Sequence, residues 1–168
     1  MTQKTDFEDI KAKILNRAKA AQACTEQYSL AYKSETLQEL CSVIKDNFHW
    51  WVNNKVITSD LLIQYRKDFA QNDIFINISV RCGFLLCSNA RVKAFGNVTV
   101  EACDIATVKA YGNVTVKAWN NATVEAYDNV YCTSYRIIEC KLSNNAIYRV
   151  KSTNTVYYSS TNINFVKQ

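Results

Sequence analysis

The sequence predicts an α+β chain, with an N-terminal helical cap followed by a parallel β-helix (β-solenoid) of octad repeats, two octads or 16 residues to each coil. An eight-residue motif recurs from Ala90, reading ARVKAFGN, VTVEACDI, ATVKAYGN, VTVKAWNN and ATVEAYDN. It continues in degraded form through the octads that begin at Val130, Ile138, Ala146 and Asn154. The first 80 residues lack this motif and carry helix signals instead. We therefore expect a helical cap with one initial strand at residues 1–82 and the solenoid at residues 83–168.

Three helices are expected in the first domain. Thr5 with Glu8, and Thr36 with Glu39, form capping boxes, and Ser59 is expected to cap a third helix. The first helix is predicted to run to about residue 23. Apolar residues recur at helical spacing behind these caps: Ile10, Ile14 and Leu15; Leu37, Leu40, Cys41, Ile44 and Phe48; and Leu62, Tyr65 and Phe69.

Residues 74–80 alternate like a strand after a turn at Asn72–Asp73 and lead into the repeats. We expect the helices to cover the open end of the solenoid, because unpaired strand edges invite association. A cap that also binds a partner is the alternative.

Each octad predicts one short strand and one corner. Positions one, three and five are Ala or Val, whereas positions two and four are mostly Thr and then Lys or Glu, so one face of the strand is buried. Positions seven and eight are mostly Gly, Asp or Asn, which tolerate left-handed backbone conformations.

The chemistry of the stacked columns favours two octads per coil. A 16-residue coil places Lys109 over Glu125 and makes an Asn ladder along position eight, at Asn97, Asn113, Asn129 and Asn145. A 24-residue coil would instead stack Lys93 with Lys117, and Glu101 with Glu125, which is unfavourable. We favour a flattened solenoid of about five coils, and a three-sided coil of 24 residues is the alternative.

Composition suggests a reducing cytoplasm. The chain starts with a polar stretch and has no apolar run typical of a signal peptide or a membrane span. Its seven cysteines show no paired spacing, and Cys132 and Cys140 occupy position three of consecutive octads as small buried hydrophobes. We expect a cytoplasmic protein without a disulfide framework.

Charge is concentrated on the repeats. Residues 1–80 carry ten basic and ten acidic residues, whereas residues 81–168 carry ten basic and five acidic residues. The excess of +5 is mild evidence for an acidic partner, either a protein or a nucleic acid. The alternative is a solenoid that happens to be basic.

Residues suited to catalysis or to metal binding are not gathered in the sequence. His49 stands alone among aromatic residues, and the chain has no glycine-rich phosphate loop and no Cys-x-x-Cys motif. In a 16-residue coil Glu101 and Asp104 lie on the opposite sheet from Glu125 and Asp128. We expect no enzyme activity, no metal and no cofactor.

Position six of the octads carries the most functional pattern. Phe95, Tyr111 and Tyr127 form one column, and Cys103, Trp119 and Tyr135 form the other. They are expected to point outward beside Lys93, Lys109 and Lys117, where they could stack on nucleotides or anchor a protein. The alternative is that stacked aromatics only stabilise the coil.

The repeat loses its regularity after Val130, where a specific surface could be built. We add Arg136, Arg149 and Lys151 to the candidate binding residues, with Tyr135 beside them. A terminal coil that must protect its own edge is a competing cause of the same irregularity.

The motifs ATVKAYGN, YCTSYRIIECKLSNNAIYRV and LQELCSVIKDNFHW resemble those of octapeptide-repeat β-solenoid proteins of Bacteroidetes and their phages and mobile elements. The resemblance implies the architecture and supplies no catalytic residues. Small proteins from mobile elements include inhibitors of bacterial defence, anti-CRISPR proteins among them. By this association we expect a non-enzymatic inhibitor of a defence complex such as an RNA-guided CRISPR nuclease.

The expected partner is an acidic protein or a ribonucleoprotein, such as a CRISPR effector nuclease or its guide RNA, and no membrane. A homodimer through the terminal edge of the solenoid is also expected. A structural or adhesive module of a phage or cell-surface assembly is the alternative function. A carbohydrate-processing β-helix would require Glu101 and Glu125 to meet in one groove.

Overall fold

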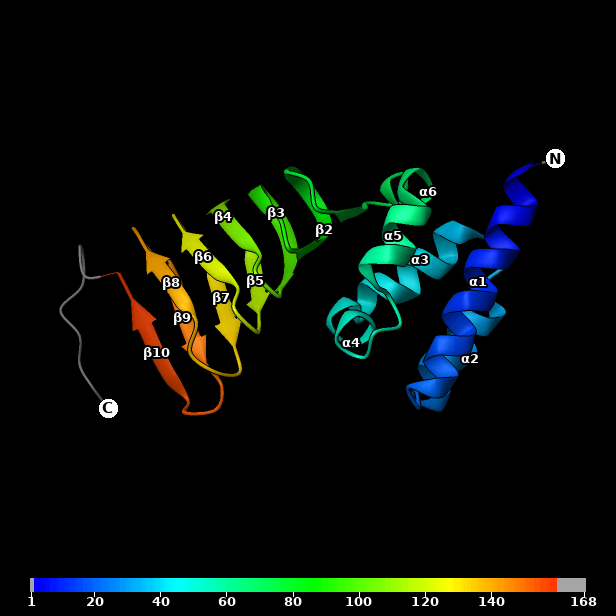
Figure 1. Ribbon diagram of the computed structural model, residues 1–168, viewed down its shortest axis with the longest axis horizontal. Helices are drawn as coiled ribbons and strands as arrows, with labels where there is room; N and C mark the ends of the chain where they lie inside the picture. The colour runs from blue at the N-terminus through cyan, green and yellow to red at the C-terminus, as the bar shows by residue number, and fades with distance from the viewer. Residues whose placement is uncertain (1, 160–168) are drawn as a thin grey trace. The chain divides into compact units, whose positions relative to one another are not determined.

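The structure, a computed structural model, describes residues 2–159, with side chains from Asp6 onward. The chain forms two compact units, Met1–Ile74 and Phe75–Gln168. The first consists of helices and the second of stacked strands, as Figure 1 shows. The end of the octad that begins at Asn154 lies outside the described residues.

The helical unit contains more helices than the sequence indicated. The helices are α1 (Thr2–Ala20), α2 (Thr25–Lys33), α3 (Leu37–Asp46), α4 (Phe48–Asn53), α5 (Ser59–Gln64) and α6 (Arg66–Ala70). The expected apolar faces largely form its core, since Ile10, Ile14, Leu40, Ile44 and Leu62 have no exposed surface. The prediction that this unit caps the solenoid stays a prediction.

One of the three expected helix caps forms as predicted. Thr36 caps α3 and accepts a hydrogen bond from the Glu39 backbone N–H at 3.2 Å. The third cap is Thr58 rather than Ser59, because Thr58 holds the extended backbone that an N-cap requires and accepts from the Leu61 N–H. The first helix begins at Thr2, so Thr5 lies inside it, and the side chain of Thr5 lies outside the described part.

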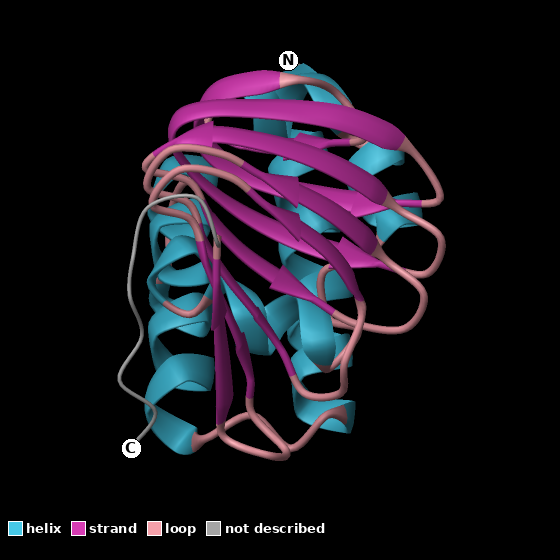
Figure 2. Cartoon of the chain, turned by 90° about the vertical axis from the view of Figure 1, so that its left-hand side faces the viewer, coloured by secondary structure: helices cyan, strands magenta, loops and turns pink. Residues whose placement is uncertain are grey.

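The second unit is a parallel β-solenoid of about four turns. Its strands are β1 (Ile74–Ile76), β2 (Val80–Ser88), β3 (Arg91–Cys103), β4 (Thr107–Gly112), β5 (Thr115–Ala118), β6 (Thr123–Ala126), β7 (Tyr131–Ser134), β8 (Glu139–Leu142), β9 (Ile147–Val150) and β10 (Thr155–Tyr158). Figure 2 shows most of these strands stacked side by side.

The strands form two layers that are joined through β3. The first layer contains residues 91–96 of β3, then β4, β6 and β8. The second layer contains β2, residues 98–103 of β3, then β5, β7, β9 and β10. Val100 pairs with Val116 and Val108 pairs with Val124, so successive coils are offset by 16 residues. The 16-residue coil is therefore confirmed, and the 24-residue alternative is wrong.

The Val and Ala residues at octad positions one, three and five make the core, as the alternation predicts. Val100, Val108, Val116 and Val124 have no exposed surface, and the Ala columns beside them are equally buried. Cys132 replaces Val in the same column and is also fully buried. Its thiol pKa is raised by a hydrogen bond with Cys140 and by burial.

The corners use the left-handed conformations expected of them. Gly96, Gly112, Asp104, Asn120 and Asp128 all have positive φ. Three of the four residues of the predicted Asn ladder bond to one another, because the amide of Asn129 donates to Asn113 at 3.3 Å and that of Asn145 donates to Asn129 at 3.2 Å. The sequence did not reveal a second ladder, in which Ser88 and Asn120 both donate to the Asp104 carboxylate.

The last strand does not continue the coil. β10 runs antiparallel to β9, with Thr155 opposite Val150 and Tyr158 opposite Ile147. The solenoid therefore makes about four turns rather than the expected five, because the octad that begins at Asn154 reverses direction instead of crossing to the first layer.

Candidate basic groove and aromatic ladder

The first layer carries a continuous aromatic ladder on its outer face. The rings of Phe95 and Tyr111 stack with centroids 5.2 Å apart, and those of Tyr111 and Tyr127 stack at 4.7 Å. The planes differ by only 11° and 7°. Both faces of the Tyr111 ring are therefore covered, one by Phe95 and the other by Tyr127. An incoming base or sugar can contact only the edge of the Tyr111 ring.

Charged groups contact the residues at both ends of this ladder. The Arg81 guanidinium lies over the Phe95 ring, 5.2 Å from its centroid. At the other end the Tyr127 hydroxyl donates to the Glu125 carboxylate at 2.9 Å. These contacts favour the interpretation in which the aromatic column stabilises the coil, since its rings are already stacked and hydrogen-bonded within the chain.

Octad position four forms a charged row beside the ladder. Lys93 pairs in register with Lys109, Lys109 with Glu125, and Glu125 with Lys141. The Lys109 ammonium lies 3.0 Å from the Glu125 carboxylate. The hydrogen bond from Lys109 and that from Tyr127 lower the pKa of Glu125, and the same Lys109–Glu125 bond raises the pKa of Lys109.

We expect the Lys109–Glu125 pair to make the solenoid slightly more stable at neutral pH than in acid. A lowered carboxyl pKa stabilises the fold above the ordinary pKa of 4.5, and this stabilisation is lost as the pH falls through the lowered value. Glu125→Gln should therefore melt slightly below the wild type at neutral pH, and the two melting temperatures should converge only as the pH falls below the lowered pKa of Glu125. Thermal melts across this range, with Glu139→Gln as the control, test the effect. A difference between wild type and Glu125→Gln that did not change with pH would contradict it.

A shallow groove opens on the same outer face at the first two turns. It has a volume of about 270 Å³ and is lined by Ser79, Arg91, Val92, Lys93, Thr107 and Lys109. Arg91 and Lys93 are exposed, and the Lys93 backbone N–H is held by the Ser79 hydroxyl at 2.9 Å. We call these six residues the basic groove.

Four of the six residues of the basic groove, Ser79, Arg91, Val92 and Lys93, lie in a stretch of chain without acidic residues. Residues 74–100 contain Arg81, Arg91 and Lys93 and no Asp or Glu. Of the three cations that line the groove, Lys109 is paired with Glu125. Positive charge is therefore concentrated at the first two turns, and the later turns of the same layer mix signs through Glu125, Glu139 and Lys141.

The other candidate residues lie on the second layer and its corner. Lys117 follows Glu101 in register, and Trp119 continues from β5 into the corner. Tyr135 is 68% exposed, and the backbone bonds Lys151 N to Ser134 O and Ser152 N to Tyr135 O bring Lys151 beside it. Arg149 lies on β9 and donates to the Asn154 side chain at 2.7 Å.

The eleven candidate residues thus divide between two surfaces. The first layer carries Lys93, Phe95, Lys109, Tyr111 and Tyr127, and the second layer with its corner carries Lys117, Trp119, Tyr135, Arg136, Arg149 and Lys151. Ser79, Arg81, Arg91 and Thr107, which were not predicted, belong with the first group. The absence of acids between residues 74 and 100 was the signal that could have found Ser79, Arg81 and Arg91.

The acidic side chains of the repeats do not converge. Glu101 belongs to the second layer and Glu125 to the first. Asp104 and Asp128 lie in two different corner ladders, where Asp128 accepts from the Asn144 amide. Glu101 is fully buried, although its octad position faces outward, and Leu86 and Lys117 flank it in register. The paired carboxylates that a glycoside hydrolase would need do not meet.

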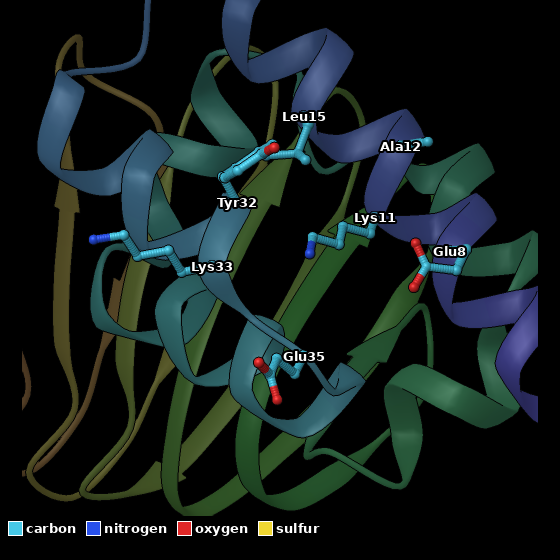
Figure 3. Close-up of a pocket in the computed structure, with 7 residues that line it drawn as sticks. All are labelled: Glu8, Lys11, Ala12, Leu15, Tyr32, Lys33 and Glu35. Carbon is cyan, nitrogen blue, oxygen red and sulfur yellow. The ribbon is translucent and has the colours of Figure 1, made fainter.

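The helical unit has a groove of its own, drawn in Figure 3. It measures about 440 Å³ and is lined by Glu8, Lys11, Ala12, Leu15, Tyr32, Lys33 and Glu35. Lys11 reaches from α1 into this groove, whereas Lys33 points away. The Lys11 ammonium donates to the Ser34 carbonyl at 2.6 Å and lies over the Tyr32 ring, so contacts within the chain already hold it.

Residues 2–159 contain no group of three or more His, Cys, Asp or Glu side chains placed to hold a metal ion. Burial raises the pKa of the Cys41 and Cys87 thiols to about 12. In the part of the chain that the structure describes, no helix combines the length and the apolar character needed to cross a membrane.

No protein family, curated protein or solved structure matches this chain. We therefore infer the function of the chain from the basic groove, the aromatic ladder and the second-layer surface.

Proposed function

We propose that the protein is a non-enzymatic binding protein that holds an acidic partner against the basic groove. The observation that carries the proposal is the concentration of Arg91, Lys93 and Lys109 around one groove, of which Arg91 and Lys93 lie in a stretch of chain, residues 74–100, that contains no acidic residue. A rigid row of cations attracts an anionic surface and orients it on the coil.

The biological setting that we propose comes from the resemblance to octapeptide-repeat proteins of phages and mobile elements. The partner is a bacterial defence complex such as an RNA-guided CRISPR nuclease, whose acidic surface or guide RNA lies in the basic groove and whose action is blocked. The aromatic ladder supports this groove by fixing the spacing of the lysines beside it, since Lys109 and Tyr111 share one strand.

Reversing the charge of the basic groove is expected to abolish binding. Arg91→Glu combined with Lys93→Glu should weaken retention of the defence complex, or of single-stranded RNA, by at least about tenfold, because two cations become anions at the contact. Pull-down from host lysate, followed by fluorescence anisotropy with labelled RNA, measures the loss.

The second layer provides a matched control. Arg149→Glu with Lys151→Glu makes the same change of net charge at exposed positions, and it should leave binding nearly unchanged. Equal losses in the two double variants would show that overall charge, rather than the groove, drives binding. Recovery of neither a nuclease nor a nucleic acid by the wild-type chain would overturn the proposal.

A structural or adhesive module of a phage or cell-surface assembly is the second candidate. The observation that favours it is the group of apolar side chains exposed on the last described turns of the solenoid, among them Tyr135, Ile137 and Tyr157.

A further inference from the structure

The outer face of β3 carries a row of cations where the first layer begins. Arg91, Lys93 and Phe95 alternate outward along this strand, whereas Val92 and Ala94 face the core and are buried. Alternate residues of a strand lie on one face, roughly 6.7 Å apart. The first two outward positions are therefore basic side chains at a fixed spacing, and both are exposed.

The third outward position carries positive charge as well, because the Arg81 guanidinium lies 5.2 Å from the centroid of the Phe95 ring. β2 and β3 shift register on either side of Arg81, as strands do at a β-bulge, and a bulge redirects the side chains beside it. Arg81 is exposed, and a cation–π contact leaves its positive charge intact. We call Arg81, Arg91 and Lys93 the cationic row.

Carboxylates are absent from the sequence around this row and from its register neighbours in β4. Residues 74–100 contain no Asp or Glu, and residues 91, 93 and 95 pair with Thr107, Lys109 and Tyr111. Glu125 belongs to the following strand, β6, where it is bonded to Lys109 at 3.0 Å. The cationic row therefore gathers three positive charges beside strands whose own charges are balanced.

The backbone edge of β3 beside the row is already occupied. The Lys93 N–H donates to the Ser79 hydroxyl at 2.9 Å, and Val80 pairs with Ala94. A peptide that bound by adding a strand would need free backbone groups at this edge. The cationic row therefore offers a partner its charge rather than a strand edge, which disfavours an acidic peptide that binds by strand addition.

The aromatic rings next to the row leave little room for bases to stack. Tyr111 lies between Phe95 and Tyr127, with ring centroids 5.2 Å and 4.7 Å away, and Arg81 lies over Phe95. Proteins that hold nucleic-acid bases stack them on free aromatic faces. A nucleic-acid strand at this surface would therefore be held through its phosphates and not through its bases.

We propose that the cationic row binds the phosphodiester backbone of a nucleic-acid strand, which lies along β3 and is held without recognition of its bases. The inference rests on the proposed function, since it names the anion that the basic groove attracts. Every nucleotide carries one negative charge, so the phosphates recur as evenly as the cations of the row. Carboxylates on a protein surface have no such regular repeat. The two guanidinium groups, of Arg81 and Arg91, also suit phosphate, because each can donate two parallel hydrogen bonds to it.

The salt dependence of binding counts the phosphates in contact. Three contacts with a single strand predict that a plot of log affinity against log salt has a slope of about −2, measured by fluorescence anisotropy with labelled oligothymidylate. Arg81→Gln should reduce this slope to about −1.4, whereas Arg81→Lys should retain it. Arg136→Gln removes the same charge from an exposed corner residue and should leave the slope unchanged. Circular dichroism checks that the variants fold, and equal slopes for Arg81→Gln and the wild type would overturn the proposal.

Recognition of the backbone alone predicts that the bases do not affect binding. Oligothymidylate, oligoadenylate and an abasic deoxyribose-phosphate polymer of the same length should bind the wild-type chain with affinities within about threefold of one another. A loss of about tenfold or more for the abasic polymer would show that the bases contribute, and would contradict the proposal. Failure of the wild-type chain to bind any of the three polymers would contradict it as well.

Nuclease treatment separates the failure of this inference from the failure of the proposed function. A defence complex retained by the wild-type chain should be released when the pull-down is treated with a nuclease that digests both RNA and DNA. Retention that survives digestion, but is lost when Arg91→Glu and Lys93→Glu are combined, would mean that an acidic protein surface occupies the basic groove. The proposed function would then stand, and the assignment of a nucleic-acid backbone would be wrong.

Discussion

Val116→Asp is expected to destroy the solenoid. Val116 has no exposed surface, and its register neighbours in the coils on either side are Val100 and Cys132. A carboxylate at this position would be buried among apolar side chains without a cation to pair with. The expected loss is about 4 kcal/mol or more, which is comparable with the whole stability of many domains.

Thr115 supplies the matched control for this change. It precedes Val116 on β5, is half-buried and faces outward. Thr115→Asp should cost no more than about 1 kcal/mol, because its carboxylate can reach water. Denaturant unfolding followed by circular dichroism measures both variants. Equal stability of the two would mean that Val116 does not face the core and that the alternation has been assigned to the wrong face.

The coil length could be predicted because residues that attract or bond to each other recur every 16 residues and therefore stack in successive coils. Asn113 and Asn129 bond along the corner, and Lys109 meets Glu125, only if successive coils are 16 residues apart. The same register also stacks Lys93 over Lys109, so avoidance of like charges is incomplete. This pair is tolerated because Lys93 is exposed and Lys109 turns to Glu125.

The reversal at β10 could not be predicted in the same way. A period of two residues describes a parallel and an antiparallel strand equally well, so the alternation within residues 155–158 does not reveal direction. The information lies in the turn at residues 151–154, where Asn154 has a φ of +52° and Arg149 donates to the Asn154 side chain. Ser152 and Thr153 stand at positions seven and eight, where the regular corners mostly have Gly, Asp or Asn, but this departure does not by itself specify the direction of the next strand.

The candidate site was predicted in part. Alternation placed Phe95, Tyr111 and Tyr127 in one outer column, and their rings do stack there. Pattern alone could not show that the stacking occupies the ring faces. Lys93 and Lys109 of the basic groove were among the predicted residues, but Arg91 was missed because it stands at octad position two, where the repeat has Thr. Arg91, which departs from the repeat, is thus more informative about the candidate site than the Thr that the other regular octads carry at this position.

Gly112→Val is expected to cost about 3 kcal/mol or more. Gly112 has a φ of +82°, which a β-branched residue adopts only with strain. A Cβ at this position would lie 3.2 Å from the Gly96 nitrogen and 3.3 Å from its Cα, both of them backbone atoms of the preceding coil. The strained φ and the close approach of the Cβ to Gly96 therefore both destabilise the variant, and a backbone movement that relieves one of them does not relieve the other.

Asp128 is the matched control, since it occupies the same corner column one coil further on with a φ of +58°. Asp128→Gly keeps the conformation and loses only hydrogen bonds, including that from the Gly112 N–H at 3.1 Å, so a cost of about 1 kcal/mol is expected. Denaturant unfolding of both variants separates backbone geometry from side-chain bonding. If Gly112→Val lowered the free energy of unfolding no more than Asp128→Gly does, the corners would be able to move apart. That result would mean that tight stacking at position seven does not set the spacing of the coils.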